Sequence, residues 1–216
     1  MVKNRSIRIL LMTAFCSLAV TLSAARAAAA GDTFKQSAEL GKRTAKTSED
    51  IDKYVTQLDK TEHALALVSQ AEGKDVKKRY ESFREEVKKL ENAQKHATSD
   101  INEMKSSGAE YFSSWDTSIV QISSPELRQA SIERRSKVMK DHDELNVSLN
   151  DIGSQLQPFM SNLRDVEAFL GTDLSPANIA KASEMIQKSW ADAQALKGNI
   201  AGVQTTLKQF LSEAPK

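Results

Sequence analysis

Cysteine is almost absent from this chain, because Cys16 is the only one among its 216 residues. It lies in residues 1–30, where a basic start, an apolar run and an alanine-rich tail follow one another as in a cleavable signal peptide. We predict cleavage near Ala30, which leaves residues 31–216 without thiols and excludes disulfides and cysteine-ligated metals there. Phe15 occupies the position where a lipoprotein has a small residue, so we expect no lipid anchor. The leader predicts a periplasmic or secreted protein.

The chain also lacks an excess of basic over acidic residues. Four of the 30 basic residues lie in the predicted leader, so residues 31–216 carry 26 basic against 29 acidic side chains. Domains that bind nucleic acid usually carry a basic patch or stripe. We therefore expect no nucleic-acid partner.

Histidine is scarce, and nothing around it resembles a catalytic or metal site. None of His63, His96 and His142 follows a glutamate by three residues, as the ligand pairs of di-iron bundles do. Adjacent residues on a helix point in different directions, so Asp141 and Asp143 cannot join His142 on one ion, and we interpret His142 as a polar core residue. Glycine-rich phosphate loops and nucleophile elbows do not occur. The sequence predicts no catalytic residue, no metal and no cofactor, and we expect a protein that is not an enzyme.

Proline and glycine are few and mark the ends of helices. Ser124-Pro125 and Ser175-Pro176 each place a capping serine before a proline at the first helical position. Gly73 and Gly171 stand where a helix is expected to end. These positions predict helices over 34–70, 75–121, 125–170 and 176–213.

The apolar residues repeat at alternating steps of three and four in the second and third of these segments. The second segment shows this from Val76 to Trp115, and the third from Leu145 to Leu170. Short connections make neighbouring helices antiparallel. We therefore predict one all-α domain over residues 31–216, an elongated up-down-up-down four-helix bundle of coiled-coil character. Pro158 is expected to bend the third helix without breaking it.

Aromatic residues make up only 6% of the chain, yet Tyr111, Phe112 and Trp115 lie close together. Counting back from the turns places Phe34 and Phe210 at the same level, which predicts an aromatic layer at one end of the core. Helices two and three should continue about 12 Å beyond this layer, while the first and fourth stop. Either the chain termini cover this hairpin tip, residues 112–128, or part of it is exposed to a partner. Its candidate contact residues are Phe112, Trp115, Ile119, Val120, Ile122 and Leu127.

Basic residues gather at the start of the third helix, beside the tip. This candidate basic face could contact anionic headgroups or an acidic partner, or it could be a solvated face paired with neighbouring acids. It consists of Arg128, Arg134, Arg135 and Lys137.

Two stretches carry a family resemblance: "YFSSWDTSIVQISSPELRQASIERRSKV" and "QPFMSNLRDVEAFLGTDLSPANI". They resemble the DUF 2959 family, a domain of unknown function, and the similarity covers nearly all of residues 31–216. It implies an all-helical, coiled-coil-like envelope protein and no assigned activity. Family members include lipoproteins, and the Phe15-Cys16 pair departs from that pattern.

Together these observations predict an interaction or scaffold module that uses the hairpin tip. Its expected partner is a protein or a second copy of the chain. The alternative is a peripheral protein that binds a lipid or envelope surface through Trp115 and the basic face.

Overall fold

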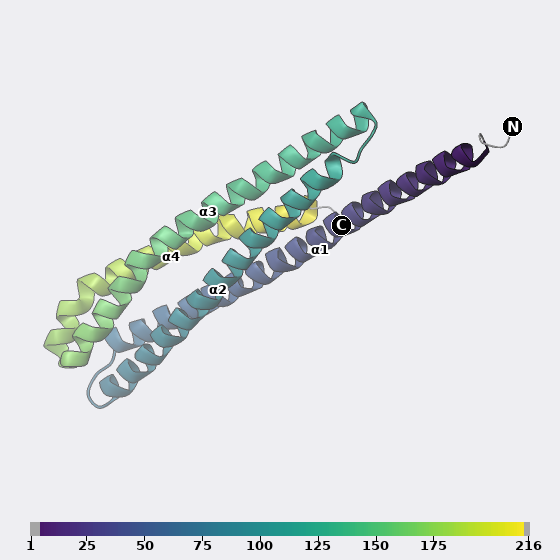
Figure 1. Cartoon of the computed structure of the whole chain (residues 1–216). Coiled ribbons are helices and arrows are strands. Elements are labelled where there is room, and N and C mark those ends of the chain that lie inside the picture. The colour runs from purple at the N-terminus through teal and green to yellow at the C-terminus, as the bar shows by residue number, and fades with distance from the viewer. Residues whose placement is uncertain (1–4, 214–216) are drawn as a thin grey trace.

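The computed structural model describes the backbone of residues 5–213 and the side chains of residues 31–213. It contains four helices, α1 (Arg5–Ser69), α2 (Asp75–Ile119), α3 (Pro125–Thr172) and α4 (Pro176–Glu213), and the described residues form no strand (Figure 1). The predicted all-α class is confirmed. The predicted leader, residues 1–30, lies outside the described side chains and stays a prediction.

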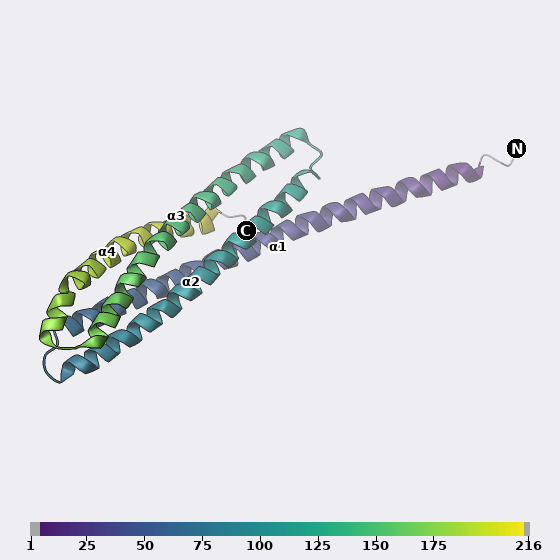
Figure 2. The ribbon, with the colours of Figure 1, turned by 60° about the vertical axis from the view of Figure 1, so that its left-hand side comes forward.

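The four helices surround one core. α1 contacts α2 and α4, and α3 likewise contacts α2 and α4. Figure 1 shows the chain turning back at each connection, so that successive helices lie side by side. In both ribbon views the N-terminal part of α1 extends past the turn between α2 and α3 (Figure 2).

The predicted apolar seams form the core. On α2 the buried residues run from Val76 to Ile119, and on α3 they run from Val138 to Leu170. Each such side chain contributes about 1.5–3 kcal/mol on burial. Gly73 has a φ of +60°, a left-handed conformation that glycine adopts without a steric penalty, and it turns the chain into α2. α3 continues through Pro158, as expected.

α1 and α2 share the most extensive helix contact, and its centre is polar. Thr47 donates a hydrogen bond to the backbone oxygen of Asp100 at 3.1 Å, and the Lys46 ammonium lies 2.6 Å from the Asp100 carboxylate. Further along, Thr61 donates to the Glu86 backbone oxygen at 3.2 Å. Threonine is small enough to let the two backbones approach while its hydroxyl satisfies a buried carbonyl. The polar contacts therefore fix the register of α1 on α2.

Charged side chains join the two hairpins along their edges. Lys197 of α4 lies 3.0 Å from Asp59 and 2.5 Å from Glu62 on α1. On the opposite side, Tyr80 of α2 donates to the backbone oxygen of Glu167 on α3 at 2.9 Å. These contacts hold the α1–α2 hairpin against the α3–α4 hairpin, so the tip is presented by a bundle tied on both sides.

Candidate functional site: the hairpin tip between α2 and α3

The turn at the tip is an ordered structure. Ser124 caps α3 by accepting a hydrogen bond from the Leu127 backbone N–H at 3.3 Å, and Pro125 begins the helix. The Arg128 guanidinium donates to the backbone oxygen of Ile122 from Nε at 3.0 Å and from Nη2 at 2.6 Å. These hydrogen bonds join the end of the turn after α2 to the start of α3. The side chains of the turn are therefore held in place before any partner binds.

An aromatic layer closes the core below the tip. The Tyr111 ring lies 5.2 Å from Phe112 and 5.3 Å from Trp115, measured between centroids. His142 joins the layer, with its ring 5.4 Å from Phe112 and 5.8 Å from Phe210. Burial raises the pKa of Tyr111 to about 12, so its hydroxyl stays neutral. The layer predicted from Tyr111, Phe112 and Phe210 is present.

Phe34 does not belong to this layer, and that part of the prediction is wrong. Its side chain is 66% exposed. The prediction that this part of α1 lies beside the end of α2 is correct, since the neighbouring Thr33 hydroxyl lies 2.9 Å from the Ser114 hydroxyl and 2.7 Å from that of Ser118. Adjacent residues on a helix face different directions, so when Thr33 faces α2, Phe34 faces solvent.

His142 occupies the polar core position that the sequence predicts. Its side chain lies against Gly108 of α2, and its Nδ1 is 3.2 Å from the Asn146 amide nitrogen. Burial lowers the pKa of His142, and the nearby Asp143 offsets this only in part. The ring is therefore neutral near pH 7 and serves as a packing element, consistent with its place between two aromatic rings.

The six candidate tip residues divide into three groups. Phe112 and Ile119 are buried, each with 6% exposure, so the prediction that they form part of an open contact surface is wrong. Trp115 and Ile122 are half-buried, and the Trp115 indole donates to the Ser131 hydroxyl at 3.1 Å. The two fully exposed members are Val120, at 69%, and Leu127, at 66%.

The ends of α1 and α4 explain this division. α4 ends at Glu213, beside Arg134, so the hairpin does extend past α4 as expected. α1 does not stop short, because Thr33 still contacts Ser118 in the last turn of α2. The expectation that both outer helices end below the tip is therefore wrong for α1. The part of the tip left open is the turn itself.

The candidate basic face is used inside the molecule. Arg134 donates to the Glu213 backbone oxygen at 2.5 Å, and the Lys137 ammonium lies 2.9 Å from the Glu213 carboxylate, where two cations suit the negative end of the α4 dipole. Lys137 lowers the pKa of Glu213. Arg135 contacts both oxygens of Asp116 at 2.6 Å and lies over the Phe112 ring, 5.7 Å from its centroid. Together with the Arg128 contact in the turn, these bonds join α3 to the ends of α2 and α4.

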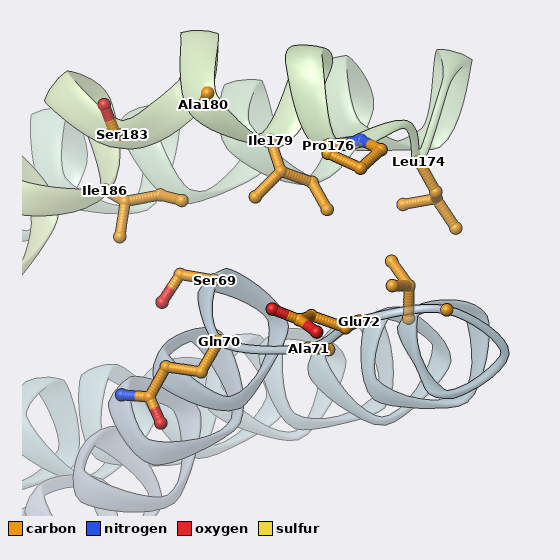
Figure 3. Close-up of a pocket in the computed structure, with 12 residues that line it drawn as sticks. Ser69, Gln70, Ala71, Glu72, Leu174, Pro176, Ile179, Ala180, Ser183 and Ile186 are labelled. Carbon is orange, nitrogen blue, oxygen red and sulfur yellow. The ribbon is translucent and has the colours of Figure 1, made fainter.

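A separate groove of about 690 Å³ lies at the opposite end of the bundle, and no pattern in the sequence predicts it. Figure 3 shows Ile179 and Ile186 of α4 facing the end of α1, with Ser69 and Glu72 on the other wall. Near this end, Tyr80 joins the hairpins on the α2–α3 side, whereas the α1–α4 side is joined further along by the contacts of Gln194 and Lys197 with Glu62. The walls of the groove are largely apolar.

Within the described side chains, no three His, Cys, Asp or Glu residues are grouped to hold an ion. Among residues 31–213, whose side chains are described, no helix is both long and apolar enough to span a membrane.

A family model described as "Protein of unknown function (DUF2959)" matches residues 35–214, which include the second half of α1 and all of α2, α3 and α4. The chain belongs to this family. The match confirms the resemblance drawn from the tip and from the second half of α3. We found no significant match among curated proteins or solved structures.

Proposed function

We propose that this DUF2959 protein is a non-enzymatic interaction module whose hairpin tip binds another protein. The observation that carries the proposal is the pair of exposed apolar side chains, Val120 and Leu127, one at each end of the ordered turn between α2 and α3. Exposed apolar residues that cluster mark contact surfaces more often than isolated ones do. Two further apolar residues of the tip, Trp115 and Ile122, are half-buried.

The rigidity of the turn supports binding. Ordering a flexible loop costs free energy on association, and a loop already bound by its own hydrogen bonds avoids that cost. The Arg128 bonds to Ile122 and the Ser124 cap supply this order. The tip is thus suited to insert Val120 and Leu127 into an apolar pocket of a partner.

A protein partner fits the tip better than a lipid surface does. Binding to anionic headgroups would use the basic face, and Arg134, Arg135 and Lys137 are paired with groups of this chain. We place the activity in the periplasm or outside the cell, on the strength of the leader in the sequence and of residues 31–216 being free of cysteine.

The test is site-specific photocrosslinking in the native cell. A photoreactive residue is placed at Val120 or at Leu127, with Lys88 and Lys208, which are exposed on α2 and α4, as control positions. We expect one discrete crosslinked protein from the tip positions and none from the controls. Equal crosslinking from all four positions would refute the proposal, as would crosslinks from the tip to lipid alone.

A further inference from the structure

The groove at the end of the bundle opposite the tip has the size and the lining of a ligand site. Its volume of about 690 Å³ lies within the range of about 300–1,000 Å³ that is usual for small-molecule pockets. Val76 of α2 and Ile179 and Ile186 of α4 give it an apolar interior, while Ser69 of α1 and Ser183 of α4 each add a hydroxyl group. A mostly apolar cleft with a few polar groups is typical of sites that bind small molecules.

The charge of the groove is negative. Glu72 is the one charged side chain among the described residues that line it, and it lies on the α1 wall opposite Pro176 and Ile179 of α4 (Figure 3). Glu72 forms no ion pair with another described residue. Lys74 and Lys181 are close to the groove in sequence, but neither lines it. The Glu72 carboxylate is therefore free to pair with a positive charge on a ligand.

The end of α1 adds to this negative potential. The last carbonyl oxygens of a helix have no partner within the helix and carry a partial negative charge. The last turn of α1 contains no basic residue, and it ends at Ser69 on the groove wall. The partial positive charge at the start of α4 is already offset, because the Asp173 carboxylate accepts a hydrogen bond there from the Ser175 N–H at 2.9 Å. The groove therefore favours a cation over an anion.

We infer that this groove binds a small molecule in which an aliphatic chain carries a positively charged amine. The chain would lie along Ile179 and Ile186, and its removal from water supplies most of the affinity. The ammonium group would lie beside Glu72, at the end of α1. Because Glu72 is exposed, its charge contributes modestly and chiefly determines which ligands are preferred. The site lies at the opposite end of the molecule from the tip and does not depend on what the tip binds.

Isothermal titration calorimetry of the full chain with three matched probes tests the site. Octylammonium, octanol and octanoate have the same aliphatic chain and differ in the charge of the head group. At pH 7 we expect one site that binds octylammonium about tenfold more tightly than octanoate, with octanol between them. Absence of octylammonium binding, or equal affinity for the three probes, would overturn the proposal.

Two substitutions locate the binding, each with a matched control. Glu72→Gln should reduce the tenfold preference to about twofold, which is the share left to the end of α1, whereas Glu110→Gln, exposed on α2, should leave it unchanged. Ala180→Trp places a large ring in the groove and should abolish binding, whereas Ala201→Trp, exposed elsewhere on α4, should not. A preference that survives Glu72→Gln in full, or undiminished binding by Ala180→Trp, would refute this site.

Discussion

Gly108→Ala tests the contact between α2 and α3 below the tip. A Cβ atom built at Gly108 would lie 2.5 Å from His142 Cε1 and closer still to Nε2. His142 cannot retreat easily, because Phe112 and Phe210 hold its ring at centroid distances of 5.4 and 5.8 Å. The new methyl group must therefore displace a packed ring.

Two opposing effects set the magnitude. Replacing a glycine inside a helix with alanine stabilises the helix by about 1 kcal/mol. Overpacking a close-fitting core costs about 1–3 kcal/mol, and a ring confined between two others belongs in the upper part of that range. We therefore expect the free energy of unfolding to fall by about 1–2 kcal/mol.

Urea unfolding followed by circular dichroism measures this change against a matched control. Gly153 lies inside α3 with no atom within 4 Å of a Cβ built on it, so Gly153→Ala should raise the free energy of unfolding by about 1 kcal/mol. Removing the ring with His142→Ala should make Gly108→Ala less harmful. If Gly108→Ala stabilises the chain as much as Gly153→Ala does, His142 does not pack on Gly108 and the described α2–α3 contact is wrong.

Three further predictions concern the tip and the layer below it. Ile119→Ala should destabilise the fold by about 2–5 kcal/mol because the side chain is buried, whereas Val120→Ala should change stability by less than about 0.5 kcal/mol, and equal effects in urea unfolding would contradict the assigned burial. Since burial lowers the pKa of folded His142, the unfolded chain takes up the proton first as pH falls below about 6.5, and stability should then fall by at most about 1.4 kcal/mol per pH unit. His142→Phe should remove this loss in urea unfolding between pH 7.5 and 5.5, and an unchanged slope would assign it to other groups. Ser124→Ala should cost about 1 kcal/mol through loss of the α3 cap, and no change in the urea midpoint would show that the cap contributes nothing.

The core of this fold could be predicted from the sequence because its signal is local. Apolar residues at steps of three and four determine which face of α2 and α3 is buried, and Ser-Pro pairs determine where α3 and α4 begin. The position of His142 followed from the same spacing, because it lies three residues before Leu145 on the α3 seam.

The polar seam of α1 could not be found in this way. Thr47 and Thr61 of α1 are buried against α2 and donate to the backbone oxygens of Asp100 and Glu86, and the Asp100 side chain is buried with them. Their burial depends on hydrogen bonds to a helix far along the chain, which an apolar pattern does not record. The contact between α1 and α2 is nevertheless the most extensive between any two helices of the described residues.

The position of the turn between α2 and α3 was predicted correctly, but the exposure of the individual side chains at the tip was not. Ile119 and Val120 are adjacent apolar residues, and their opposite exposures depend on which way the last turn of α2 faces α1. The partners of Arg134 and Lys137 were missed for a similar reason, since both bind the last residue of α4. The position of a residue along the bundle axis can be counted from the turns. The direction in which its side chain points depends on the rotation of the helix about its own axis.

The central claim is that Val120 and Leu127 serve binding and not folding. The most direct measurement combines Val120→Asp and Leu127→Asp in one chain that carries a photoreactive residue at Gln121, and compares its urea midpoint and its crosslinking with those of the same chain without the two substitutions. The exposed positions predict an unchanged midpoint and loss of the crosslinked partner. Undiminished crosslinking with the fold intact, or a fall of several kcal/mol in the free energy of unfolding, would contradict the claim.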